Sequence, residues 1–292
     1  TPDLRRLLTI AAPAVLAGGV VQINLLVGRQ VGSFFDGAIA WLSYADRLYQ
    51  LPLGVVGIAI GIVLLPDLSR RLKAADTFGS RYALSRATEF ALFLTVPAAV
   101  ALCVIPIPVI SVLYERGAFT GADTAPTALA LAVYGAGLPA FVLQKVLQPL
   151  YFAREDTRTP FRFALWSMVI NAGLAIGLAP FLGFIAAALG TTLAGWAMTA
   201  QLWWGTRAMG EAARADDRLR ARLPRAIAAS AVMGLFLWGA ETALADQLAT
   251  HGHRYWALAV LVLAGMAVYG AAAYLLGAFR LSDFRSGLSR QR

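Results

Sequence analysis

Residues 42–71 read LSYADRLYQLPLGVVGIAIGIVLLPDLSRR, and this stretch decides the fold. Up to residue 65 it is mostly apolar and long enough for an α-helix to cross the hydrocarbon core of a bilayer, which takes about 20 residues. An Asp46–Arg47 pair lies inside the run, and two arginines follow it. The pattern predicts a transmembrane helix that carries charges within the membrane and ends at a basic surface.

The whole chain has the composition of a membrane protein. Hydrophobic residues make up 59% of its 292 residues and charged residues only 14%. A soluble globular domain carries about 25% charged residues, so this chain has too few to cover a soluble surface. The net charge of +9 does not indicate a nucleic-acid-binding protein, because the basic residues form short clusters between apolar runs.

The apolar runs predict an all-α, polytopic membrane protein with about eight transmembrane helices. The predicted spans are 7–34, 42–65, 83–105, 125–150, 161–180, 183–205, 225–243 and 255–278. The chain begins at Thr1 and shows no signal peptide, so we expect a fragment or a processed piece of a longer protein.

The distribution of Lys and Arg predicts the orientation, because cytoplasmic loops are enriched in both. If the N-terminus is cytoplasmic, that side holds 20 of the 25 basic residues, and the other side holds Arg116 and Arg254. The cytoplasmic set is Arg5, Arg6, Arg70, Arg71, Lys73, Arg81, Arg86, Arg154, Arg158, Arg162, Arg207, Arg214, Arg218, Arg220, Arg222, Arg225, Arg280, Arg285, Arg290 and Arg292. Both termini are therefore predicted to be cytoplasmic. The stretch from Arg207 to Arg225 has two interpretations. It is either a basic linker or surface helix at the level of the lipid headgroups, or an ordinary cytoplasmic loop enriched in Lys and Arg.

Polar groups inside the spans are the candidates for a functional site, since ionisable residues in a membrane usually face a cavity. The ionisable ones are Arg29, Asp46, Arg47 and Lys145, with Glu89 near a span end; the uncharged ones include Gln22, Asn24, Gln50, Asn171 and Thr191. Asp46 and Gln50 share one helix face. The Arg47 guanidinium can bind a phosphate with two prongs, or it can simply snorkel to the interface.

Signatures of enzymes and metal sites are missing. The sequence contains no nucleotide-binding loop, no nucleophile elbow and no paired catalytic carboxylates, so we predict no enzyme activity and no cofactor. The single cysteine, Cys103, forms no intrachain disulfide, and His251 and His253 lack further ligands at metal-site spacing.

Several stretches resemble signatures of the MurJ (MviN) family of bacterial lipid II flippases. They are VQINLL at 21–26, YADRLYQLPLG at 44–54, LLPDLSR at 64–70, LYERGAF at 113–119 and YFAREDTRTP at 151–160. Together they cover roughly residues 1–205, whereas the region after 225 matches only in hydropathy. The alternatives are a drug or polysaccharide-lipid exporter of the same superfamily, a membrane-embedded glycosyl- or acyltransferase, and a helical scaffold without transport activity.

The resemblance implies the fold of the multidrug/oligosaccharidyl-lipid/polysaccharide exporter superfamily, with this chain supplying helices seven to fourteen. Residues 1–205 would form the six-helix C-terminal lobe, and 206–224 a basic cytoplasmic linker. Residues 225–280 would form two extra helices that line a groove for the lipid tail, and 281–292 a basic tail. The N-terminal lobe would be absent.

The resemblance also implies the activity, which is flipping of lipid II from the inner to the outer leaflet of the cytoplasmic membrane by alternating access. Arg47 aligns with a cavity arginine of the family, and Asp46, Gln50, Gln22 and Asn24 would line the same cavity. Lipid II, membrane lipids and the absent lobe would be its partners, and nucleic acid would not.

Some members of the family hold sodium with two carboxylates and a nearby Asn and Thr. Asn171 and Thr191 would be the remnant of that ion site, while Gly28 and Ala175 stand where the carboxylates are expected. A hard cation needs anionic oxygen ligands, so no metal site is predicted.

Overall fold

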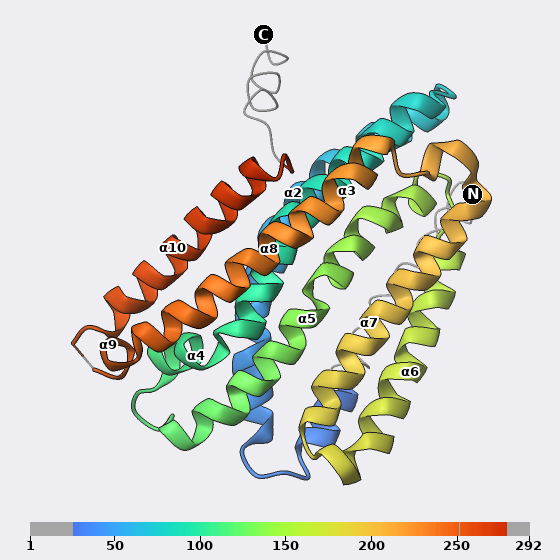
Figure 1. The fold of residues 1–292 in the computed structure, drawn as a ribbon. Coiled ribbons are helices and arrows are strands. Elements are labelled where there is room, and N and C mark those ends of the chain that lie inside the picture. The colour runs from blue at the N-terminus through green and yellow to red at the C-terminus, as the bar shows by residue number, and fades with distance from the viewer. Residues whose placement is uncertain (1–25, 251, 279–292) are drawn as a thin grey trace.

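The computed structural model describes residues 26–250 and 252–278, and in these residues every regular element is a helix. A helical segment at 26–32 precedes α2 (Ala38–Lys73), α3 (Thr77–Val104), α4 (Pro106–Tyr114), α5 (Gly121–Phe152), α6 (Arg158–Leu182) and α7 (Ile185–Gly205). The 3-10 helix η1 (Thr206–Ala213), α8 (Asp217–Ala243), α9 (Ala245–Ala249) and α10 (Arg254–Leu275) follow. The predicted all-α class is confirmed (Figure 1).

The helices have the lengths that membrane spans require. In the described residues, α3, α5, α6, α8 and α10 are long and apolar enough to cross a membrane. These five correspond to the third, fourth, fifth, seventh and eighth predicted spans. The helices α2 and α7, with 36 and 21 residues, run in the same bundle. Most of the first predicted span lies outside the described residues.

Proline does not end the long helices at four positions, since α2, α3 and α5 continue through Pro52, Pro97, Pro139 and Pro149. A break occurs instead at Ile105, where the backbone leaves the helical region before Pro106. The residue before a proline is pushed out of the α conformation, and proline is tolerated in a first helical turn. Residues 106–114 therefore form the separate helix α4.

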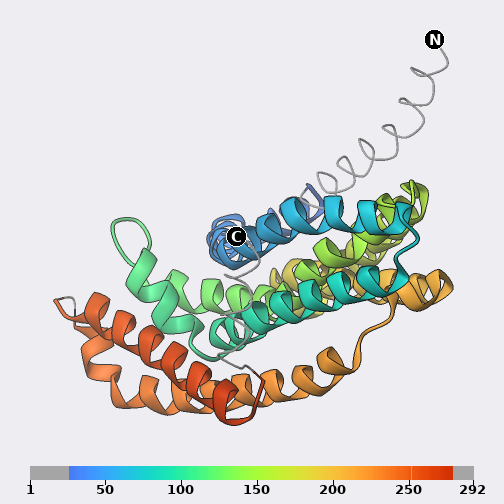
Figure 2. The same ribbon diagram turned by 90° about the horizontal axis from the view of Figure 1, so that it is seen from above.

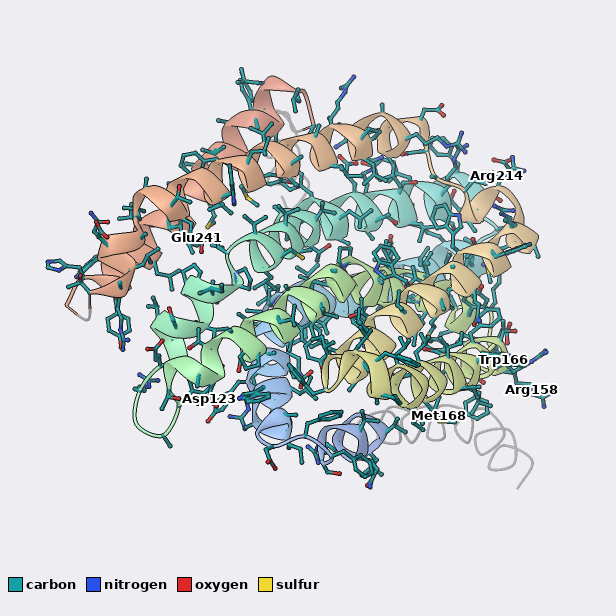
Figure 3. All side chains as sticks on the ribbon, turned by 60° about the horizontal axis from the view of Figure 1, so that its bottom comes forward. Asp123, Arg158, Trp166, Met168, Arg214 and Glu241 are labelled. Atoms are coloured by element: carbon teal, nitrogen blue, oxygen red, sulfur yellow. The ribbon has the colours of Figure 1, made fainter. Side chains whose placement is uncertain are left out.

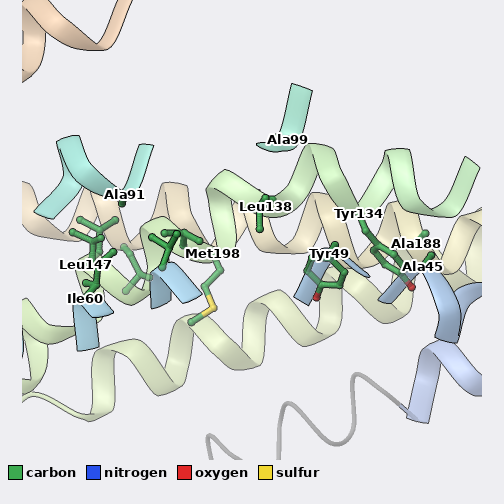
Figure 4. Close-up of a cluster of buried hydrophobic side chains, with 14 of the residues drawn as sticks. Ala45, Tyr49, Ile60, Ala91, Ala99, Tyr134, Leu138, Leu147, Ala188 and Met198 are labelled. Carbon is green, nitrogen blue, oxygen red and sulfur yellow. The ribbon is translucent and has the colours of Figure 1, made fainter. Parts of the chain in front are cut away.

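The bundle is built around α5, which packs against α2, α3 and α7. Tyr134, Leu138 and Leu147 of α5 meet buried side chains of the surrounding helices (Figure 4). Seen from above, α2 and the α8–α10 pair lie on opposite sides of α3 (Figure 2). Because α8 packs on α3 and α10 packs on α8, the last two long helices form an outer layer.

Side-chain hydrogen bonds to the partner's backbone join α5 to α7. The bonds run from Thr192 to the Val133 carbonyl, Trp196 to Ala136, Thr199 to Ala140, Gln144 to Gly195, and Tyr151 to Leu202, with donor–acceptor distances of 2.7–3.0 Å. Such interhelical bonds contribute roughly 0.6 kcal/mol each in membrane proteins. This α5–α7 ladder follows both helices along much of their length, so it fixes their register.

A cluster of charges joins α3 to α8. Glu89 of α3 accepts hydrogen bonds from Arg86 and from Arg222, the latter at 2.8 Å, and Arg218 lies 3.3 Å away. Arg86 also pairs with Asp216. The Glu89 and Arg222 side chains are only 16% and 11% exposed. Glu89, singled out in the sequence as a charge near a span end, therefore holds the first turns of α8 on α3.

Basic residues gather at one end of the bundle, here called the basic end. It is formed by the junctions at 74–76, 153–157, 206–216 and 276–278. The opposite end carries the junctions at 33–37, 115–120 and 183–184, together with residues 244–250 and 252–253, which include α9. Figure 3 shows Arg158 and Arg214 at the basic end and Asp123 and Glu241 at the other. The two groups of loops separated by the sequence thus lie at two ends, although residues 217–224 of the predicted linker begin α8.

Removing the Glu89 carboxylate should destabilise the bundle strongly. Glu89→Ala removes the carboxylate that Arg86, Arg218 and Arg222 share, and breaking a buried ion pair from one side costs about 3–5 kcal/mol. We expect a clearly lower melting temperature of the purified protein in detergent. Glu211→Ala is the matched control, because Glu211 is 53% exposed and exposed pairs contribute about 0–1 kcal/mol. Equal melting temperatures for the two variants would contradict this role of Glu89.

Candidate substrate-binding site

Aromatic contacts hold the first half of α2 in place near the end opposite the basic end. The Trp41 indole donates a 2.9 Å hydrogen bond to Asp123, and its ring meets the edge of Phe184 at 5.2 Å. Tyr44 packs against Tyr114 at 4.8 Å. Asp123 in turn caps α5 together with Thr120, whose backbone N–H donates to the Asp123 carboxylate. These contacts fix the rotation of α2 about its axis and so determine where its polar face points.

The polar residues of α2 lie away from its apolar contacts with α5. Ala45 and Tyr49 are buried, whereas Asp46 is half-buried and both Arg47 and Gln50 are exposed. The Gln50 amide donates a hydrogen bond to the Asp46 carboxylate, as their spacing of one helical turn predicts. Arg47 lies six residues beyond Trp41, which is about 9 Å along the helix at 1.5 Å per residue.

Two further cations from other segments accompany this face. Arg29, in the helical segment before α2, and Arg47 both interact electrostatically with the Asp46 carboxylate. Further along α2, a Cβ on Gly57 would lie 3.6 Å from the Lys145 side chain, so the exposed Lys145 of α5 borders the same side of the helix. Two cations thus accompany the Asp46 carboxylate, and a third borders α2 about 16 Å further along. This excess of positive charge suits an anionic ligand.

The sequence analysis assigned only some of these polar residues to the candidate site. Asp46, Arg47 and Gln50 come together, whereas Gln22 and Asn24 lie outside the described residues. Arg29 and Lys145 were recognised as charges within spans but were not assigned to the site, although their charge in an apolar run was the available signal. Tyr114, which interacts electrostatically with Arg47 from the end of α4, belongs to the LYERGAF stretch at 113–119 but was not assigned to the site.

Asn171 and Thr191 also come together, on α6 and α7. The Thr191 hydroxyl lies 3.5 Å from the Asn171 amide oxygen, and Asn171 is only 2% exposed. A Cβ on Gly190 would lie 2.9 Å from the Asn171 carbonyl oxygen, so glycine is what lets the two backbones approach. In the described residues no cluster of three or more His, Cys, Asp or Glu residues could hold a metal ion.

Comparison with known proteins decides the family. The model of the lipid II flippase MurJ family matches residues 1–275. Probable lipid II flippases MurJ from Rhizobium tropici and Rhizobium meliloti are each 43% identical to the chain, over 100% and 99% of its length. The chain belongs to the MurJ family. A solved lipid II flippase MurJ in an inward closed conformation matches 94% of the chain with a TM-score of 0.76 and 28% identity.

The chain spans about half the length of these relatives, since it covers 55% of both Rhizobium proteins and of the solved structure. It corresponds to their C-terminal portion. Membership of the MurJ family, together with the apolar helices, makes this a multi-pass membrane protein of a transporter family rather than of a catalytic enzyme family.

Because α6 and α7 approach closely at Gly190, one added methyl group there should weaken the packing between the two helices. Gly190→Ala places a Cβ against the Asn171 backbone and amide, so the helices must separate, and we expect a lower melting temperature in detergent. The matched control is Gly173→Ala, also inside a helix, where a Cβ meets nothing within 4 Å. There the helix propensity of alanine should leave stability unchanged or raise it by up to about 1 kcal/mol. A Gly190→Ala variant as stable as the control would contradict the packing.

Proposed function

We propose that the chain is part of a flippase that moves lipid II across the bacterial cytoplasmic membrane by alternating access. The observation that carries the proposal is the cationic face formed by Arg29, Arg47 and Lys145 within predicted spans, in a chain of the MurJ family. The substrate is the undecaprenyl-pyrophosphate-linked disaccharide-pentapeptide. Its pyrophosphate is an anion that needs positive charge where water is scarce.

In this proposal the cationic face is one wall of a cavity between two lobes. The second lobe belongs to the N-terminal half of the longer protein, which the chain does not include. Alternating access requires one half to move against the other, so the chain alone would not transport. Residues 225–280 serve as the two extra helices beside the lipid tail, and no residue acts as a catalyst or holds a cofactor.

Arg47 has the central role in this proposal, because its guanidinium offers the fork that matches two phosphate oxygens. Asp46 and Gln50 orient the neighbouring surface through their hydrogen bond. The Arg47 side chain is exposed, which leaves its guanidinium accessible to a ligand.

Substitution of Arg47 separates phosphate binding from snorkelling. In the full-length protein, Arg47→Ala should abolish complementation of a flippase-depleted strain, and lipid II should accumulate. Arg47→Lys should remain defective, because an ammonium group cannot form the two-pronged contact, whereas a snorkelling role would be filled by lysine. Accumulation of lipid II also distinguishes this substrate from those of drug or polysaccharide exporters.

The control for Arg47 must be an arginine whose removal should cost little stability. Arg254 is unsuitable, because it is buried and donates a hydrogen bond to the Glu115 carbonyl at 3.3 Å. Arg70, on the same helix and 79% exposed, is suitable, and Arg70→Ala should complement fully. Full complementation by Arg47→Ala at matched membrane levels would remove Arg47 from the site.

We also propose that the basic end faces the cytoplasm and that both termini of the chain lie there. Single cysteines introduced in a Cys103→Ala background of the full-length protein test this in intact cells. A membrane-impermeant thiol reagent should label position 116 and should not label position 158, because basic loops are retained in the cytoplasm. Labelling at 158 without labelling at 116 would invert the proposed topology.

A further inference from the structure

A cavity of about 590 Å³ lies between α3, α5, the α7–η1 junction and the start of α8, at the basic end. Leu92, Leu143, Leu219 and Leu223 form much of its wall. Its volume falls within the range of about 300–1,000 Å³ that is usual for ligand pockets. Among the described residues, none of those that line the cavity belongs to α2 or α10, so the cavity differs from the cationic face and from any groove between α8 and α10.

The path of the chain after α7 creates this cavity. Both α3 and α7 pack on α5, and Leu143 of α5 lies between them. After α7, η1 turns at Gly210, whose φ of 73° suits glycine, and leads across to α3. There the backbone N–H of Asp216 donates to the Ser85 hydroxyl at 3.0 Å. Residues 206–216 thus bridge from α7 to α3 and border the space between the two helices.

Arginines of this bridge and of α8 supply positive charge to the same cavity. Arg207, Arg214 and Arg220 all line it and all are exposed. Arg214 pairs with Glu211, whereas Arg207 lies 5.5 Å from the Trp204 ring centre. Within the described residues neither Arg207 nor Arg220 has a carboxylate partner, in contrast to Arg86 and its neighbours on Glu89. The cavity therefore combines an apolar wall with uncompensated guanidinium groups.

The neighbouring aromatic residues indicate the depth of this site in the membrane. Trp203 lines the cavity and is 43% exposed, and Trp204 is 72% exposed. Tryptophan is enriched at the level of the lipid headgroups, where its ring is half in hydrocarbon and half in water. The guanidinium groups of Arg207 and Arg220 are thus at the level where a lipid phosphate lies, with the leucine wall extending towards the acyl region.

We propose that this cavity binds an anionic phospholipid, with its phosphate held by Arg207 and Arg220 and part of an acyl chain on the leucine wall. Charge complementarity selects this occupant. A soluble anion would leave the apolar wall uncovered, and a lipid without net charge would leave the two guanidinium groups without a counter-charge. The site goes beyond the proposed flipping function, since it lies apart from the Arg47 face and would hold a lipid that is not transported.

Binding can be measured with the purified full-length protein in phosphatidylcholine bilayers that contain increasing fractions of phosphatidylglycerol with brominated acyl chains. Bromine quenches tryptophan fluorescence on contact, so quenching should saturate at low fractions of this lipid, and Trp203→Phe should remove part of it. The double variant Arg207→Gln/Arg220→Gln should weaken the binding by roughly 10–30-fold, since each basic residue near a lipid surface contributes up to about fivefold.

The matched control is Arg70→Gln/Arg158→Gln, which removes the same charge from exposed positions at the same end and should leave the affinity unchanged within about threefold. Leu223→Trp should obstruct the cavity and weaken binding while both arginines remain, and melting temperatures show that each variant is folded. Unchanged affinity in the folded Arg207/Arg220 variant, equal binding of brominated phosphatidylcholine, or displacement by millimolar inorganic phosphate would each overturn the proposal.

Discussion

Water is absent from the hydrocarbon core, and this single constraint governs the rest of the structure. Backbone polar groups must be satisfied within each segment, which leaves helices as the form of every long described element. Side-chain polar groups must find partners as well. The hydroxyl, amide and indole groups on α5 and α7 bond to the partner's carbonyls, and the charges near the membrane surface gather around Glu89. Polar side chains here act as connectors between helices.

The same constraint makes the remaining polar groups, which do not join helices, candidates for ligand binding. Arg47 stands on an exposed face of α2, and Arg207 and Arg220 border a cavity with a leucine wall. An exposed guanidinium in or next to the membrane is stable only beside water or an anion. The two places differ in their surroundings, because Arg47 has a carboxylate and an amide beside it, while the other pair has tryptophan and leucine. The first arrangement suits a polar head group and the second suits a lipid.

Much of the fold could be predicted from the sequence, because hydropathy and the positions of Lys and Arg act locally. The Asp46–Gln50 contact was predictable too, since a spacing of four residues fixes it on any helix. The Glu89 cluster was not, because its partners are 129 and 133 residues away along the chain. The third predicted span ended at residue 105, next to the end of α3, but the short helix α4 after it was not predicted. The cavity at η1 depends on a turn at Gly210, which hydropathy does not detect.

The separation between Glu89 and its partners has a consequence for synthesis. When α3 enters the membrane, Asp216, Arg218 and Arg222 have not yet been translated, and only Arg86, one turn earlier, can accompany the carboxylate. At about 5–20 residues per second, the wait for α8 lasts on the order of 10 s. Completion of α8 would thus finish the anchoring of a helix inserted long before.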